Sequence, residues 1–208
     1  MTRHTLLTLA ATALLTSTAA AQFFTPGNAV VLRVGDPAIT LGSIAAPIFL
    51  DEWDTNTNTL VQSLAIPNSS TGATPSTTQR GYSSSEGCLT LSSDGRYLIL
   101  AGYDRAVGAT DPGAEPAIST NRVIVRVDTL TGFIDSSTAL TDAYDSSTIR
   151  GATSVDGQSR RRSGAALFPR MCQEALNGGA VLTSCGECYA FQLGRSRSSF
   201  LVITSRSI

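Results

Sequence analysis

Three observations predict that the chain folds as an all-β protein. Apolar residues come in short β-branched runs separated by turn-forming residues, which is typical of sheets. Beyond the first 21 residues, no window of useful length has the i, i+3, i+4, i+7 apolar spacing of a helix. Turn-forming residues also fill Asp54–Thr59, and the pairs Asp94-Gly95, Thr131-Gly132 and Asp156-Gly157 place glycine where tight hairpins need a positive φ. At 208 residues, the chain has the length of one domain or slightly more.

The composition excludes several classes of protein. Only 15% of the residues are charged and 6% are aromatic, with a formal net charge of −1, which disfavours coiled coils, charge-rich disordered chains and basic nucleic-acid binders. All 15 basic residues are arginine. Without lysine, the chain has no Schiff-base, P-loop or catalytic-lysine chemistry.

The first 21 residues have the layout of a cleaved secretory signal peptide. Arg3 precedes the apolar stretch Leu6–Leu15, and three alanines come just before Gln22. A buried N-terminal helix or a transit peptide is the alternative. We expect a mature chain that starts near Gln22, is secreted, periplasmic or at the cell surface, and has no membrane span. Removal of His4, the only histidine, excludes Ser-His-Asp catalysis and histidine zinc sites.

Seven segments are predicted to be strands because their β-branched and aromatic residues are bounded by turn formers. They are Ala29–Val34, Ile48–Trp53, Leu60–Ile66, Cys88–Leu91, Tyr97–Tyr103, Arg122–Asp128 and a segment around Phe133–Ile134. The stretch Val123–Val127 is nearly unbroken apolar, which indicates an inner strand covered on both faces.

These strands recur in a repeating order. A Ser-x-Asp-Gly turn precedes the strand at Tyr97, and Ser154–Gly157 begins the same pattern again. The strand, turn and strand of Val125–Phe133 also repeat the shape of Phe49–Leu64. A period of about four strands favours β-propeller blades, with a sandwich as the alternative. Residues 22–157 provide about two four-stranded antiparallel units, so the propeller is incomplete and its open edges favour self-association.

An ordered series of short segments carries a family resemblance. The series comprises Phe24–Asn28, Val30–Val34, Phe49–Glu52, Leu60–Ser63, Ser85–Gly87, Ser93–Tyr97, Leu100–Tyr103, Asn121–Val123 and Leu140–Ala143. It resembles the first part of uncharacterised secreted bacterial β-propeller proteins with YVTN or lactonase-like repeats, over roughly residues 22–157. The resemblance implies fold and export, and it brings no catalytic residues with it.

Residues 158–208 differ in composition from the preceding part. Residues 22–157 contain seven arginines and fourteen carboxylates, a balance of −7, whereas residues 158–208 contain seven arginines and two carboxylates, a balance of +5. Gln158–Arg162 stands where the repeat requires a strand like Arg96–Gly102. We therefore expect an irregular tail and an interrupted repeat, as in a truncated or frameshifted member of the family. Phe200–Ile203 is the exception, since it could pair as an edge strand.

Three of the four cysteines lie in this tail, at Cys172, Cys185 and Cys188, and the fourth is Cys88. Cys185 and Cys188 have the spacing of half a zinc site or of a redox motif. In an exported chain they would more naturally form disulfides, and the sequence leaves the pairing open. We expect no cofactor.

The sequence leaves two functions open. The first is an extracytoplasmic binding or interaction module for an extracellular or cell-surface ligand, with exposed loops such as Asn68–Gln79. The second is a secreted, lactonase-like hydrolase in which carboxylates and arginines meet at strand ends. The candidate catalytic residues for this hydrolase are Asp51, Arg96, Asp104 and Arg150. Asp51 stands on the same face of its predicted strand as Trp53, so the neighbouring Glu52 points to the other face.

Overall fold

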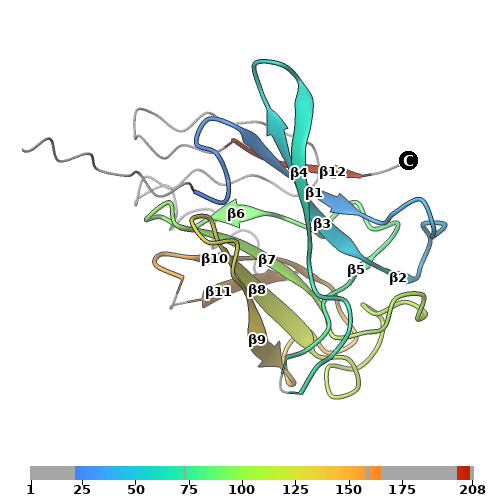
Figure 1. Cartoon of the computed structure of the whole chain (residues 1–208). Coiled ribbons are helices and arrows are strands. Elements are labelled where there is room, and N and C mark those ends of the chain that lie inside the picture. The colour runs from blue at the N-terminus through green and yellow to red at the C-terminus, as the bar shows by residue number, and fades with distance from the viewer. Residues whose placement is uncertain (1–21, 73, 158–159, 165–200, 207–208) are drawn as a thin grey trace, which may run out of the picture.

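A computed structural model describes residues 22–72, 74–157, 160–164 and 201–206, and every structural statement below concerns this part of the chain (Figure 1). The described part contains strands and no helix, which confirms the all-β prediction. The strands are β1 (Ala29–Val34), β2 (Ala45–Ala46), β3 (Ile48–Asp54), β4 (Thr59–Ala65), β5 (Gln79–Arg80), β6 (Thr90–Leu91), β7 (Tyr97–Tyr103), β8 (Arg122–Asp128), β9 (Ile134–Leu140), β10 (Ile149–Ser154), β11 (Arg160–Gly164) and β12 (Leu201–Arg206).

All seven predicted strands are present. β1, β7 and β8 have the predicted bounds, and the bounds of β3 and β4 differ from the predicted ones by one residue. β6 is shorter than expected, and β9 extends further, to Leu140. The sequence did not predict β2, β5 or β10, because two are very short and the third, Ile149–Ser154, is only weakly apolar.

The strands form three principal sheets. Sheet 1 has the order β12-β1-β3-β4, sheet 2 is the meander β6-β7-β8-β9, and sheet 3 is the pair β10-β11. A short ribbon of β2 and β5 accompanies them. All pairings are antiparallel except that of β12, which runs parallel to β1.

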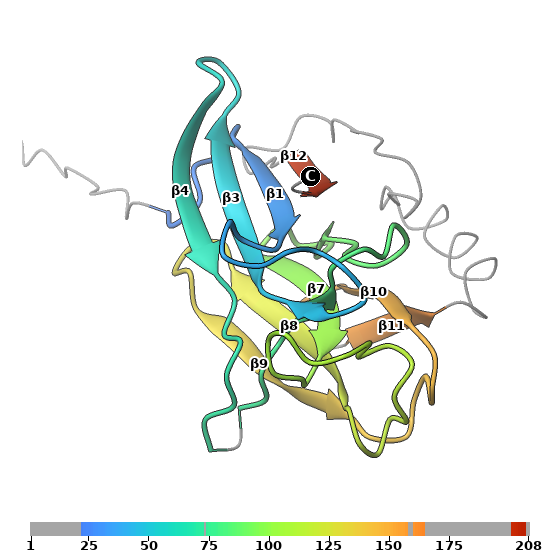
Figure 2. The ribbon, with the colours of Figure 1, turned by 90° about the vertical axis from the view of Figure 1, so that its right-hand side faces the viewer.

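The main core lies between sheets 1 and 2, which Figure 2 shows one above the other. Alternate residues of each strand point into it, as the two-residue period of a strand requires. These residues include Val30, Leu32 and Val34 of β1, Ile48 and Leu50 of β3, Leu98 and Leu100 of β7, and Val123, Val125 and Val127 of β8. Each such side chain contributes roughly 1.5–3 kcal/mol when buried, so this interface is the main source of stability.

The other face of sheet 2 is covered by β10. Ile99, Ala101 and Ile124 pack there against Ile149 and Ala152. The three sheets are therefore stacked in chain order. Because both of its faces are covered, β8 is nearly unbroken apolar, and the prediction of an inner strand at Val123–Val127 is confirmed.

Sheet 3 is attached to sheet 2 by backbone contacts at Cys88 and Gly151, which form a parallel bridge. A Cβ on Gly151 would lie 2.7 Å from the Cβ of Cys88, so only glycine fits this approach. Cys88 is disulfide-bonded, and the other three cysteines lie outside the described residues.

The turn of the β3–β4 hairpin recurs in the β8–β9 hairpin. Asp54 Oδ1 accepts hydrogen bonds from the N–H groups two and three residues later, at 2.7 and 3.3 Å, and Asp128 Oδ1 does the same at 2.8 and 3.3 Å. The N–H four residues on, of Asn58 or Gly132, donates to the aspartate carbonyl at 2.8 Å in both hairpins. Both residues have positive φ, 54° and 72°. The predicted turn chemistry is confirmed at both positions.

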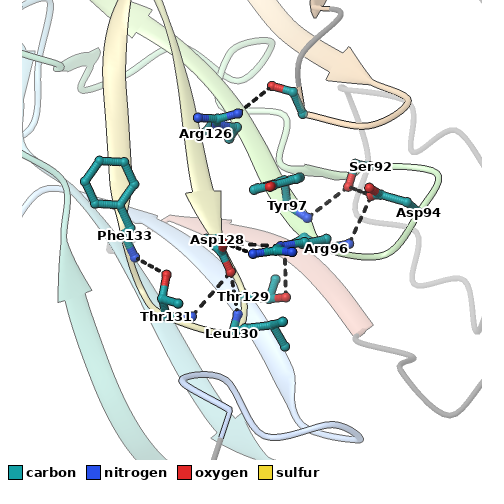
Figure 3. A network of polar contacts seen from close by, with 11 residues as sticks. Ser92, Asp94, Arg96, Tyr97, Arg126, Asp128, Thr129, Leu130, Thr131 and Phe133 are labelled. Carbon is teal, nitrogen blue, oxygen red and sulfur yellow. Dashed lines mark hydrogen bonds and ion pairs between the residues drawn. The ribbon is translucent and has the colours of Figure 1, made fainter.

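The Ser-x-Asp-Gly turn before β7 closes through its own side chains (Figure 3). Ser92 Oγ donates to Asp94 Oδ1 at 2.5 Å and accepts from the N–H of Tyr97 at 2.9 Å. The second copy of the turn lies after β10, where the Gly157 N–H donates to Ser154 Oγ at 2.8 Å. Gly95 and Gly157 have nearly the same φ, 74° and 73°. The same sequence motif, with the same glycine conformation, thus occurs in two successive sheets.

The structure differs from the expected irregular tail in two segments. β11 follows the second Ser-x-Asp-Gly turn and pairs with β10, at the place where the sequence suggested an interruption. β12 contains the apolar, β-branched run that the sequence marked as a possible edge strand, and it pairs with β1. Both strands gain backbone partners from the stacked sheets. The rest of the tail lies outside the described residues.

Candidate functional site

The long connections of the fold meet at one end of the sheets. Because neighbouring strands are antiparallel, the short turns of residues 55–58, 92–96 and 129–133 lie at one end, here called the turn end. The connections of residues 35–47, 66–89, 104–121 and 141–148 lie at the opposite, loop end. In Figure 2 the loops after β4, β7 and β9 extend below the sheets, while the β3–β4 hairpin points upward. Such clustered loops on a rigid scaffold commonly carry function.

Backbone hydrogen bonds join loops of sheets 1 and 2 at the loop end. The N–H of Ala45 donates to the carbonyl of Ala109, and the N–H of Gly108 donates to the carbonyl of Ala45, both at 2.8 Å. The N–H of Asp111 donates to the carbonyl of Ser43 at 2.6 Å. The connections of residues 35–47 and 104–121 are therefore joined to each other.

Arg122, at the start of β8, is completely buried beneath these loops. Its guanidinium donates to the carbonyls of Glu115 and Ser147 at 2.9 Å each, and also to those of Gly113 and Thr120. A planar guanidinium has five donors and suits such a task. Burial lowers the pKa of Arg122. This side chain holds the β7–β8 loop to the β9–β10 loop.

Glu86 is a second buried charged residue at the loop end, with 1% exposure. Its Oε1 lies 3.9 Å from Nε of Arg80. Neither carboxylate oxygen accepts a hydrogen bond of ordinary geometry from the described residues. Burial raises the pKa of Glu86, and the charge of Arg80 and the nearby Ser83 and Tyr103 hydroxyls only partly offset this effect.

Tyr103, the last residue of β7, lies between these two charged groups. It is completely buried, and burial followed by the negative charge of Glu86 raises its pKa strongly. Gly113 covers the same place: a Cβ there would lie 2.3 Å from Nη2 of Arg80 and 3.0 Å from the Tyr103 hydroxyl oxygen. A side chain at 113 would therefore displace the guanidinium of Arg80.

Exposure increases outward from this interior. The side chain of Arg80 is 13% exposed and forms an ion pair with Asp111, which is 29% exposed. Further out, Arg105 lies 3.8 Å from Glu115, and these side chains are 33% and 37% exposed. We call Arg80, Glu86, Tyr103, Asp111 and Arg122 the loop-end cluster. Its buried members cannot contact a dissolved substrate, so the cluster holds the loops in place.

The structure gives each of the carboxylates in the predicted catalytic set its own partners. Asp51, on β3, binds Arg33 Nε at 2.6 Å and Ser63 Oγ at 2.5 Å. Asp104, directly after β7, accepts from Ser76, with its N–H at 3.0 Å and its hydroxyl at 2.8 Å. Both carboxylates fix neighbouring segments in place.

The arginines of this set lie elsewhere. Arg96 is at the turn end, where Nη2 lies 2.9 Å from Asp128 (Figure 3). Arg96 and Asp104 flank β7 and are eight residues apart, or roughly 26 Å at the rise of a strand, so they do not meet. Arg150 belongs to β10, and its buried Nε has no hydrogen-bond partner in the described part of the chain. The metal candidates Cys185 and Cys188 lie outside the described residues.

Sequence reasoning did not single out the loop-end cluster or Glu52. The carboxylate of Glu52 is completely buried and accepts hydrogen bonds from Asn28 Nδ2 at 2.8 Å and Gln62 Nε2 at 2.6 Å. Its place in the alternation Ile48, Leu50, Glu52 was the available signal, because that face of β3 forms the core. For Arg122 the signal was a charged residue at the first position of a nearly unbroken apolar strand.

Comparisons of the chain with protein families, curated proteins and solved structures found no match. In the described residues, no group of three histidine, cysteine, aspartate or glutamate side chains is placed to hold a metal ion. The same part of the chain includes no helix with the length and apolarity to cross a membrane. The fold and the site define an all-β protein of stacked sheets with one well-supported loop surface.

Proposed function

We propose that the chain is an extracytoplasmic binding module of β-propeller type, with its ligand held at the loop end. The ligand is an extracellular or cell-surface molecule. One observation carries this proposal: the long connections meet at one end, over the buried side chains of Arg122, Glu86 and Tyr103. A surface that is fixed in advance loses less conformational entropy on binding.

The propeller assignment is supported by repetition within the fold. Sheets 1, 2 and 3 follow one another in chain order and in space. The Asp turn occurs in sheets 1 and 2, and the Ser-x-Asp-Gly turn occurs in sheets 2 and 3. Propeller blades are four-stranded sheets repeated around an axis, and sheet 2 is a complete four-stranded meander.

Export is supported by the signal-peptide pattern of residues 1–21 and by the disulfide at Cys88. Disulfides persist mainly outside the cytoplasm. We therefore assign the protein to the periplasm, the cell surface or the medium.

The hydrolase alternative receives less support. It requires Asp51, Arg96, Asp104 and Arg150 to meet around one substrate, and Arg96 and Asp104 stand at opposite ends of β7. The carboxylate with a raised pKa, Glu86, is sealed from solvent. A general acid must come within hydrogen-bond reach of the reacting group.

The proposal is tested on a panel of immobilised cell-surface polysaccharides and peptides. Tyr82, 55% exposed at the loop end, is changed to alanine together with Arg105. Phe133 and Leu130, 65% and 38% exposed at the turn end, are changed to alanine as the matched control. We expect the loop-end variant to lose at least about tenfold in retention and the control to behave like the unchanged chain.

A blank panel counts against a binding module. Equal losses in both variants would place the ligand away from the loop end. Turnover of lactones or glycosides by the same preparation, lost in Asp51→Asn or Arg150→Gln, would favour the hydrolase instead.

A further inference from the structure

The face of sheet 1 that points away from sheet 2 carries three regular rows of side chains. The registers place them opposite one another across β1, β3 and β4. The rows are Arg33, Phe49, Ala65, then Val31, Asp51, Ser63, then Ala29, Trp53, Leu60. We call these nine residues the outer face. Six of them are apolar, and none of these six belongs to the two core clusters of the described residues.

The three polar residues of the outer face bind one another. Asp51 accepts from Arg33 Nε at 2.6 Å and from Ser63 Oγ at 2.5 Å, and Arg33 Nη2 lies 3.3 Å from Ser63 Oγ. The guanidinium of Arg33 also lies over the ring of Phe49, 4.2 Å from its centroid. Because these groups already have partners within the sheet, covering them leaves little hydrogen bonding unsatisfied.

Five of the six apolar residues of this face remain in contact with solvent, whereas Ala29 is buried, with 5% exposure. Leu60 is 50% exposed, Ala65 is exposed, and Val31, Phe49 and Trp53 are partly exposed. Val61, at the irregularity of β4, is 51% exposed beside them. Edge-strand and sheet-face apolar groups of this kind mark interaction surfaces.

We propose that the outer face is the contact between two copies of this chain, related by a two-fold axis along the middle row. Such an axis places the row of Arg33 opposite the row of Trp53 in the other copy. Phe49 then meets Trp53, Ala65 meets Leu60, and Arg33 meets Ala29, so each large side chain faces a small or aromatic one. The face is thus complementary to itself, as an isologous interface must be.

Charge also permits this pairing. Two copies of Asp51 come near each other on the axis, but each is neutralised by Arg33 of its own sheet. The Arg33 row of one copy approaches the end of the other sheet that carries Asp54, where no basic residue of the outer face lies.

The area of the outer face is small, roughly 14 Å by 20 Å for three strands, below the ~800 Å² per partner of a standard interface. The dimer is therefore weak and reversible.

Trp53 is the only tryptophan, so its fluorescence reports directly on this face. The full chain is examined by sedimentation velocity and by tryptophan emission from about 1 to about 500 µM, a range suited to weak association. We expect the sedimentation coefficient to rise to that of a dimer. Over the same concentrations, Trp53 emission shifts to shorter wavelength and becomes less accessible to acrylamide.

Variants test the position of the contact. Leu60→Glu and Ala65→Glu each place a carboxylate on an exposed position of the outer face, and association weakens at least about tenfold because that charge would be buried without a partner. Ile118→Glu is the matched control, since Ile118 is 80% exposed at the loop end. Far-UV and near-UV circular dichroism of each variant confirm that it is folded.

Four outcomes overturn the proposal. They are a monomer at every concentration, a dimer that persists in both outer-face variants, a dimer that Ile118→Glu weakens as much, and growth beyond the dimer as in head-to-tail assembly. A blue emission that does not change with concentration also overturns the proposal, because residues of the same chain then cover the face. None of these results bears on ligand retention at the loop end, so the two proposals fail separately.

Discussion

The pKa values of carboxylates are shifted in opposite directions at the turn end and at the loop end. At the turn end, hydrogen bonds from Asn56 and Thr57 lower the pKa of Asp54. Burial alone would raise the pKa of Asp128, but hydrogen bonds from Leu130 and Arg96 outweigh it, so that pKa is lowered too. At the loop end, burial raises the pKa of Glu86. The difference comes from nearby backbone N–H groups in one case and from lost water in the other.

The two ends therefore have different tasks. The aspartates of the turn end cap hairpins with partners two to four residues away in sequence. The loop-end cluster joins residues from β5, β7, β8 and two long loops. Local capping sets the register of each hairpin, whereas the cluster fixes how separate segments lie together.

Arg122→Met should have the largest effect. It leaves four carbonyls without their donor, two of them buried and two partly buried, and we expect a loss of about 3–5 kcal/mol in the free energy of unfolding. Urea denaturation followed by circular dichroism measures it. Arg122→Lys keeps the charge but not the planar fork, so it should rescue only part of the loss. A loss below that of the turn-end variants would show that the cluster does not hold the loops.

Gly132→Ala tests the turn end. Its φ of 72° disfavours any side chain, and a Cβ would lie 2.5 Å from the ring of Phe23. We expect a loss of about 2 kcal/mol in the free energy of unfolding. Asn58→Gly, at the matching position of the β3–β4 turn with φ 54°, serves as control and should change stability little. The opposite order of effects would contradict the equivalence of the two turns.

Asp128→Asn should cost about 1 kcal/mol or less, because the amide oxygen still accepts the turn hydrogen bonds but the charge that pairs with Arg96 is lost. Because the folded pKa of Asp128 is lowered, its contribution is present above the ordinary value of 3.8 and is lost as pH falls through the folded value. The difference between variant and unchanged chain should therefore vanish in strong acid. Denaturation midpoints from pH 2 to pH 7 check this. A stability difference that does not depend on pH would show that the charge of Asp128 does not cause it.

Glu86→Gln should change the free energy of unfolding least, and it should raise this free energy where the other substitutions lower it. The folded pKa of Glu86 is raised, so its contribution is present below the ordinary value of 4.5 and is lost as pH rises through the folded value. The variant should be more stable than the unchanged chain at pH 8. At pH 4.5 the difference in stability between the two should be smaller. Arg80 keeps Asp111 as its partner. Glu115→Gln, on the surface, is the control, and destabilisation of Glu86→Gln at pH 8 would contradict the argument.

The sequence predicted the strands of sheets 1 and 2 because their apolar residues alternate or run unbroken between turn formers. It predicted the turns at Asp54, Asp94 and Thr131-Gly132 because the residues that close them are neighbours in sequence. β10 was missed because Ile149–Ser154 becomes a strand through its place on β7. The candidate catalytic set did not converge, because a strand separates Arg96 from Asp104.

The sequence by itself determined that this is an all-β protein, where its main strands begin and end, and which hairpin turns join them. Each of these properties depends on interactions between residues close together in the chain, which a local pattern records. Only the tertiary structure decided which charges are buried, which loops share an end, and which face of sheet 1 stays open. These depend on how sheets stack, and stacking brings together residues such as Arg80, Glu86 and Arg122 whose spacing in sequence carries no sign of contact.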